Sequence, residues 1–117
     1  MLGENSSLIK LELEANALGP KTAAALGDSL SRNDSLVYLN LEGNPLTGQF
    51  AQEHTINGRA EFDGVQSLAL TLSQNHTLTY LNLRRTGLGQ KGGDAIAKAL
   101  STNNKLVYLD VGSNSLG

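Results

Sequence analysis

The stretch Leu36-Val-Tyr-Leu39-Asn-Leu41-Glu-Gly-Asn44-Pro-Leu46 combines regularly spaced leucines with a closing asparagine, and the rest of the chain repeats this arrangement. The matching sets are Leu8, Leu11, Leu13, Asn16 and Leu18; Leu78, Leu81, Leu83, Thr86 and Leu88; and Leu106, Leu109, Val111, Asn114 and Leu116. The first leucines of successive sets are therefore 28, 42 and 28 residues apart. Self-similarity at a period of this size predicts a solenoid, in which each repeat stacks on its neighbours.

Each repeat is predicted to contain a short strand, a turn and a helix. In the first repeat, Leu11 and Leu13 alternate with polar residues, as in a strand with one buried face. Pro20 suits the first helical position, and we expect the helix to continue over Lys21–Arg32. The apolar triplets of the three helices are Ala23, Leu26 and Leu30; Val65, Leu68 and Leu72; and Gly93, Ile96 and Leu100. Because a helix joins each strand to the next, the strands must run parallel.

Three of the four repeats close their turn with an asparagine, at Asn16, Asn44 and Asn114. An asparagine amide can satisfy backbone groups of its own turn and of the neighbouring repeat that would otherwise be buried without partners. We therefore interpret these residues as a structural ladder. The third repeat has Thr86 at this place.

Other short motifs are explained by the repeat. Gly87-Leu-Gly89-Gln-Lys-Gly92 matches the dinucleotide fingerprint, but the first two repeats have the same layout without these glycines. Sequences of the type Asn-x-Ser/Thr recur with the repeat spacing and are interpreted as turns; they begin at Asn5, Asn33 and Asn75. His54 and His76 do not have ligand spacing. We expect no catalytic residue, cofactor or metal site, and no enzymatic activity.

The composition narrows the classes of partner. The chain has 117 residues, of which 39% are hydrophobic and 4% aromatic, which suits one small domain with an aliphatic core. With 9 basic and 11 acidic residues the net charge is −2, which argues against nucleic acid and anionic membranes as partners. There is no cysteine, which permits a reducing intracellular setting, and no apolar run long enough to cross a bilayer. We expect protein partners and no nucleic acid, membrane or small-molecule substrate.

The 42-residue spacing gives the second repeat 14 extra residues, and the insertion within residues 48–63 is expected to loop out between strand and helix. Insertions in repeat proteins lie in loops on one face, often the binding face. The alternative is a surface loop that is tolerated at little entropic cost. If the loop binds a partner, the expected contacts are Phe50, His54, Arg59 and Phe62.

The pattern Leu-x-x-Leu-x-Leu-x-x-Asn-x-Leu, followed by a full helix, resembles leucine-rich repeats. The 28-residue form is similar to the ribonuclease-inhibitor-like subclass, which also occurs in Ran GTPase-activating proteins, innate immune receptors and ciliary or cytoskeletal proteins. The resemblance implies an α/β fold, a right-handed solenoid in a horseshoe arc with short parallel strands on the concave face and helices on the convex face. It covers residues 1–117 as one array of about 3.5–4 repeats without caps, and the repeats start near Leu8, Leu36, Leu78 and Leu106.

With the strand leucines facing the core, the alternate side chains are predicted to face the concave side. In strand order they are Lys10, Glu12 and Glu14; Tyr38, Asn40 and Glu42; Tyr80, Asn82 and Arg84; and Tyr108, Asp110 and Gly112. Neighbouring strands lie about 4.8 Å apart, so the tyrosines should form one stripe. Tyrosine is enriched at protein interfaces, although a stripe can also serve only to stabilise the sheet.

We predict a protein-binding site on this face, made of Tyr38, Tyr80, Tyr108, Glu42, Arg84, Asn40, Asn82 and Asp110. Arg84 has the opposite charge to Glu14 and Glu42, which hold the same place in the first two repeats. This reversal predicts an acidic first half and a basic patch at the third strand, suited to a partner of mixed charge.

The sequence supports three functions. The first is a non-catalytic scaffold for protein–protein interaction, as a segment of a larger leucine-rich-repeat protein or assembly. The second is a GTPase-activating module similar to Ran GTPase-activating proteins, in which Arg84 or Arg85 would offset charge during phosphoryl transfer. The third is a structural element buried in a large complex. We favour the scaffold and expect an intracellular, cytoplasmic setting, including cytoskeletal and ciliary assemblies.

Overall fold

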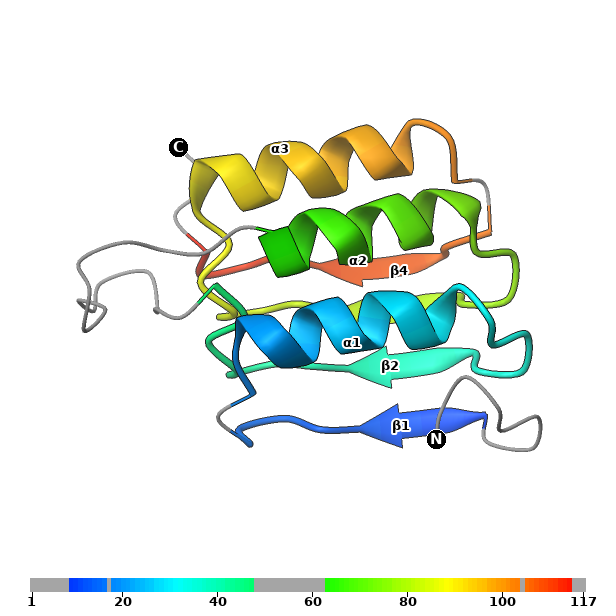
Figure 1. Ribbon diagram of the computed structural model, residues 1–117, viewed down its shortest axis with the longest axis horizontal. Helices are drawn as coiled ribbons and strands as arrows, with labels where there is room; N and C mark the ends of the chain where they lie inside the picture. Colours follow the sequence, from blue (N-terminus) through cyan, green and yellow to red (C-terminus); the bar gives the residue numbers. More distant parts are fainter. Residues whose placement is uncertain (1–8, 17, 48–62, 104, 115–117) are drawn as a thin grey trace.

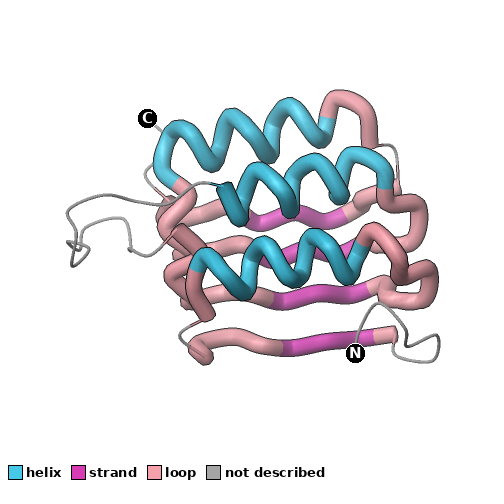
Figure 2. Tube along the Cα trace, viewed as in Figure 1, coloured by secondary structure: helices cyan, strands magenta, loops and turns pink. Residues whose placement is uncertain are grey.

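The computed structural model describes residues 9–16, 18–47, 63–103 and 105–114. These residues form two layers, a sheet and a row of helices that covers one of its faces (Figures 1 and 2). The elements in chain order are β1 (Lys10–Glu12), α1 (Pro20–Leu30), β2 (Tyr38–Asn40), α2 (Asp63–Gln74), β3 (Tyr80–Asn82), α3 (Gly89–Leu100) and β4 (Tyr108–Asp110). In the described part of the chain, no helix is long and apolar enough to cross a membrane.

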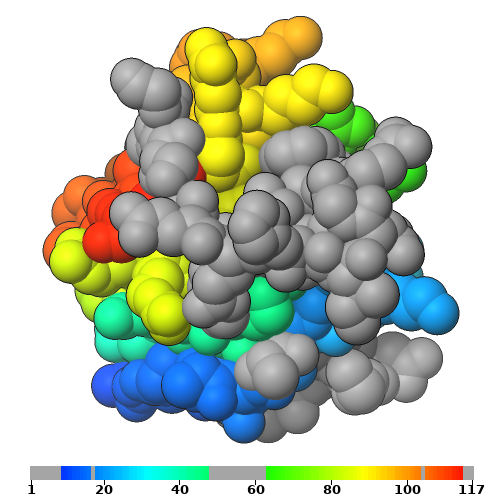
Figure 3. Space-filling model, turned by 90° about the vertical axis from the view of Figure 1, so that its left-hand side faces the viewer, coloured from blue at the N-terminus to red at the C-terminus, as the bar shows by residue number. Residues whose placement is uncertain are grey.

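The sheet is parallel throughout, with strand order β1-β2-β3-β4. Its register follows the repeat, since Leu11 lies opposite Leu39, which in turn lies opposite Leu81. Seen from the side, the first repeat (blue) lies at the bottom of the stack and α3 (yellow) at the top (Figure 3). The predicted α/β solenoid fold, with parallel strands on one side and helices on the other, is confirmed.

The leucines of the repeat pattern fill the space between the two layers. Leu36, Leu39, Leu41 and Leu46 are all completely buried in the second repeat. The first two helices contribute their predicted apolar triplets to the same core: Ala23, Leu26 and Leu30 from α1, and Val65, Leu68 and Leu72 from α2. In α3, Ile96 is buried, whereas Gly93 and Leu100 are only partly buried. One continuous aliphatic core therefore joins the repeats.

The first helix begins as predicted but ends earlier. Pro20 is its first residue, where the missing N–H has no helical partner to lose. The helix ends at Leu30 rather than at Arg32, because the backbone tightens: the Arg32 N–H donates to the Ser29 carbonyl at 3.1 Å. The prediction of this boundary was wrong by two residues.

Asn44 shows how the ladder joins one repeat to the next. Its Oδ1 accepts hydrogen bonds from the backbone N–H groups of Asn16 and Leu18, at 2.8 and 3.0 Å. Its Nδ2 donates to the carbonyls of Leu13 and Leu41, at 2.8 and 2.9 Å. Asn44 is completely buried, so these bonds satisfy backbone groups of two repeats that water cannot reach. The structural interpretation of this ladder residue is confirmed.

A second set of asparagines, Asn33, Asn75 and Asn103, closes the loops that lead from each helix to the next strand. In each case Oδ1 accepts hydrogen bonds from the backbone N–H groups two and three residues further on. Asn33 and Asn75 are only 5% and 8% exposed. Their side chains belong to turns, as predicted, and are not presented for glycosylation; Asn5 lies outside the described residues.

The glycines of the fingerprint-like motif serve the turn before α3. Gly87 and Gly89 have φ angles of +73° and +61°, which favour glycine. A Cβ atom on Gly92 would lie 3.0 Å from the Cβ of Leu88, tighter than ordinary packing. The local backbone and packing thus account for these glycines.

Candidate functional site

The three tyrosines lie on the sheet face opposite the helices and form one stack. The rings of Tyr38 and Tyr80 are 3.9 Å apart between centroids and inclined by 9°, and those of Tyr80 and Tyr108 are 4.3 Å apart and inclined by 2°. The stack forms because the three residues pair directly in the parallel register. The Nζ of Lys10 lies 4.5 Å from the ring centroid of Tyr38 and covers that end of the stack. The predicted stripe is therefore present.

Stacking also affects the titration of the phenols. The pKa of Tyr38 is raised to about 12, chiefly by its side-chain hydrogen bond with Tyr80, with smaller effects from burial and nearby carboxylates. The pKa of Tyr108 is raised mainly by burial, although its side chain remains accessible on the face of the sheet. Tyr108 is 43% exposed. Tyr38 and Tyr108 are therefore neutral at physiological pH, and the stacked rings offer rigid aromatic surface.

Two residues predicted as contacts on this face are buried instead. Asn40 and Asn82 are only 7% and 6% exposed. The Nδ2 of Asn40 donates to the Glu14 carboxylate at 3.2 Å, and that of Asn82 donates to the Glu42 carboxylate at 2.9 Å. Each carboxylate reaches diagonally from the preceding repeat and covers the amide. These asparagines fix the carboxylates in place and have little surface left for a partner.

A diagonal contact of the same kind joins β3 and β4, but there an arginine pairs with an aspartate. Arg84 Nη1 lies 3.9 Å from Asp110 Oδ1, where the other boundaries pair a glutamate with an asparagine. Asp110 has no side-chain N–H to donate to a glutamate, so a cation in the preceding repeat suits it better. Gly112 leaves room for this contact, since a Cβ atom there would lie 2.5 Å from Arg84 Nη1.

This pairing changes the predicted charge pattern of the face. The basic patch expected at Arg84 is matched by Asp110 on the neighbouring strand. Lys10 likewise pairs with Glu12, at 3.3 Å. Within the described residues the face carries these two ion pairs, and the basic patch expected at the third strand is offset by Asp110.

Sequence reasoning missed an apolar row beside the tyrosines. Ile9, Val37 and Val107 directly precede β1, β2 and β4 and are 60%, 37% and 85% exposed. Thr79 holds the same place before β3. The signal was present in the sequence, because the second position of three repeats is a large aliphatic residue that the core pattern does not require.

The four residues proposed as loop contacts, Phe50, His54, Arg59 and Phe62, lie outside the described residues. The described chain resumes at Asp63, the first residue of α2. Within the described ranges, no group of three or more His, Asp or Glu side chains is placed to hold a metal ion.

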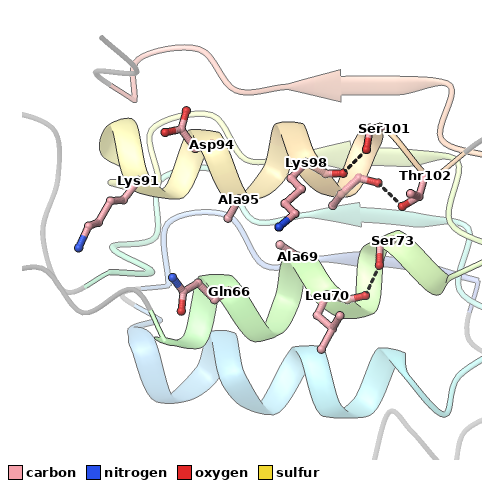
Figure 4. A pocket seen from close by; sticks show the side chains of 11 residues that line it. Gln66, Ala69, Leu70, Ser73, Lys91, Asp94, Ala95, Lys98, Ser101 and Thr102 are labelled. Atoms are coloured by element: carbon pink, nitrogen blue, oxygen red, sulfur yellow. Dashed lines mark hydrogen bonds between the residues drawn. The ribbon is translucent and has the colours of Figure 1, made fainter.

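The helix layer has a groove of about 600 Å³ between α2 and α3 (Figure 4). Between α1 and α2, Gly27 lets the backbone of Leu68 approach closely, and Ala69 holds the place of Gly27 in α2. The hydroxyls of Ser73 and Ser101, on the groove wall, donate to carbonyls three residues back, at 2.6 Å each. These two hydroxyls therefore bond to the backbone of their own repeat and are not directed into the groove.

Comparisons with known proteins agree with this geometry. Models of the leucine-rich repeat family match residues 35–53 and 74–97. The human NACHT, LRR and PYD domains-containing protein 13 is 32% identical over 111 residues, which are 94% of this chain and 9% of that protein. The solved structure of Leiomodin-1 Actin-Binding Site 2 (ABS2) has a TM-score of 0.72 and 26% identity, covering 94% of this chain and 57% of that chain.

Stacked strand-turn-helix repeats, with the buried asparagines Asn44 and Asn114 in their turns, define an α/β solenoid. The two family matches fall on the second and third repeats, where the pattern of leucines is complete. The chain is a leucine-rich-repeat protein. It spans only a small part of the length of the human relative, and somewhat more than half of the leiomodin chain.

Proposed function

We propose that this chain is a non-catalytic scaffold for protein–protein interaction, that it is a segment of a larger leucine-rich-repeat protein, and that it binds its partner on the strand face. The observation that carries the proposal is the tyrosine stack, which crosses β2, β3 and β4 and lies outside the core. Aromatic residues supply large contact area at a small cost in side-chain entropy. The position of the stack, opposite the helices, leaves it open to a partner across several repeats.

A stack that served only the sheet would account for the same geometry, so the experiment must separate the two roles. The partner captured by the intact parent protein would be identified first, and its affinity then measured for Tyr80→Ala, Tyr108→Ala and the helix-layer control Lys98→Ala. We expect Tyr80→Ala to lower the affinity by about 2 kcal/mol or more, as for a central interface tyrosine. Folding of each variant would be checked by circular dichroism.

Tyr108→Ala keeps the test informative if Tyr80→Ala weakens the fold, because Tyr108 lies at the exposed end of the stack. Equal affinity for all three variants would contradict the proposal. Deletion of residues 50–61 would then show whether the partner binds the insertion instead.

Actin is a second candidate partner, because the chain is similar over 94% of its length to a structure described as an actin-binding site of leiomodin-1. Co-sedimentation with filaments and gel filtration with monomeric actin would test this candidate directly. Binding that Tyr80→Ala abolishes would support actin as a partner of the strand face. No binding to either form of actin would remove it as a candidate.

A further inference from the structure

The tyrosine stack has different chemistry on its two sides. On the side where the strands begin lies the row of Ile9, Val37, Thr79 and Val107. Backbone hydrogen bonds tie this row together: the N–H of Val37 donates to the Ile9 carbonyl at 2.8 Å, and that of Val107 to the Thr79 carbonyl at 2.8 Å. Three of its four members are exposed aliphatic side chains. These exposed aliphatic residues form an apolar edge at the start of β1, β2 and β4, which Thr79 interrupts at β3.

On the side where the strands end, the charge that remains is negative. Glu14 and Glu42 each accept a hydrogen bond from an asparagine amide, and an amide carries no charge to offset a carboxylate. Two cations of the face are already paired, Arg84 with Asp110 and Lys10 with Glu12. Two carboxylates are therefore oriented on the face with their charge intact.

These two edges define what a partner must present. Resting on the proposed function, we propose that the strand face binds a short amphipathic segment that has apolar side chains along one edge and lysine or arginine along the other. The segment runs across the strands, with its apolar edge on the tyrosines and the aliphatic row. Its cations lie near Glu14 and Glu42.

The dimensions suit such a segment. Four strands at about 4.8 Å spacing extend over roughly 14 Å, which is the length of roughly ten residues of helix. An acidic segment is disfavoured, because its carboxylates would lie against Glu14 and Glu42, and like charges brought together at an interface repel and weaken binding. The fixed orientation of both carboxylates by asparagine amides also reduces the side-chain entropy that a partner's cations must overcome.

The test uses a phage library of random 12-residue peptides selected against the 117-residue chain, followed by synthesis of the enriched peptides. We expect the enriched peptides to be basic. Their basic and apolar residues should be spaced so that they fall on opposite edges of a helix or a strand. Their affinity should fall roughly tenfold for the double variant Glu14→Gln/Glu42→Gln, the effect of two exposed ion pairs. Glutamine keeps the acceptor that each asparagine needs, so the fold is preserved.

The matched control is Asp94→Asn, which removes one carboxylate on α3 and should leave the affinity unchanged. Enriched peptides that are acidic or neutral, yet lose affinity with Tyr80→Ala, would overturn this inference and leave the proposed function standing. Basic peptides whose affinity is the same for the double variant would overturn it as well. Peptides that bind Tyr80→Ala and Tyr108→Ala as tightly as they bind the natural chain would instead overturn the proposed function. Recovery of no peptide would count against both the proposed function and this inference.

Discussion

The first two repeats are joined differently from the second and third. At the first boundary, the side chain of Asn44 bonds to backbone groups of both repeats. At the second boundary, Thr86 holds the same place, and its hydroxyl donates to the Leu83 carbonyl of its own turn at 2.7 Å and to Asn114 Oδ1 of the following repeat at 3.4 Å, but to no described group of the second repeat. Threonine has one hydroxyl where asparagine has a carbonyl and an amide, so it cannot bridge two repeats in the same way.

The second boundary replaces this side-chain bridge with other contacts. The N–H of Leu46 donates to the backbone carbonyl of Thr86 at 3.1 Å, and the buried hydroxyl of Thr47 donates to the Gly87 carbonyl. Both donors come from the turn that follows β2. The comparison teaches that the fold requires satisfied backbone groups at each boundary, and that different residues can satisfy them.

The largest effect is expected from the core that both boundaries share. Leu81, in the middle of β3, is 1% exposed, and Leu81→Ala should reduce the free energy of unfolding by about 2–5 kcal/mol through lost burial and a cavity. Urea denaturation would measure it, with the 85% exposed Val107→Ala as control. A loss equal to that of the control would show that the core does not extend through the third repeat.

Removal of the bridge at the first boundary should have the next largest effect. Asn44→Ala leaves the N–H groups of Asn16 and Leu18 without their acceptor and should cost about 1–3 kcal/mol. Asn16→Ala is the matched control, because the Asn16 side chain is exposed and its hydrogen bond within the described residues is to the Glu14 carbonyl of its own turn. Equal losses for the two variants would contradict the bridging role of Asn44.

At the second boundary, the ladder position should matter less. Thr86→Val keeps the shape of the side chain and removes the hydroxyl's bonds to the Leu83 carbonyl and, at the longer distance of 3.4 Å, to Asn114 Oδ1. Because the hydroxyl has one proton to donate, we expect a loss of about 1 kcal/mol, the typical value of one hydrogen bond. The measurement is the same denaturation experiment, run beside Asn44→Ala. A larger loss for Thr86→Val than for Asn44→Ala would show that the ladder residue matters more at the second boundary, which would contradict this account.

The tyrosine stack crosses the second boundary on the sheet face opposite the helices. Its contribution to the free energy of unfolding is expected to be smaller, and it can be measured from the dependence of stability on pH. Because the pKa of Tyr38 is raised from about 10 to about 12, its neutral form is favoured in the folded state. The contribution is fully present below pH 10, where both states are protonated. It falls as the pH rises from 10 to 12, since the unfolded state loses its proton first.

Stability curves from pH 8 to 12 should therefore fall more steeply for the natural chain than for Tyr38→Phe, which cannot titrate. Ring absorbance would follow the titration of the phenols in the same samples. Curves that fall in parallel would show that Tyr38 titrates alike in both states.

Much of the fold was predictable because burial depends on residue type and spacing. Leu36, Leu39 and Leu41 determine the strand and its buried face, and the in-register tyrosines follow from the repeat spacing alone. The burial of Asn40 could not be predicted from residue type and spacing. It depends on the side-chain conformation of Glu14, which is 26 residues away and covers the amide from the preceding strand.

The candidate site was therefore predicted only in part. The exchange of a glutamate–asparagine pair for Arg84 and Asp110 is visible in the sequence as two changes, but only the structure shows that they are in contact. The role of the tyrosines in binding a partner remains a prediction. It rests on where the rings lie and on what surrounds them.

The most direct test of the central claim, that the strand face rather than the helix layer binds protein, is site-specific photocross-linking. Benzoylphenylalanine would replace Tyr108 in one sample and Lys98 in another, and cross-links to the partner of the parent protein would be mapped by mass spectrometry. We predict cross-links from position 108 and none from position 98. Cross-links from position 98 alone would contradict the claim and place the partner on the helices.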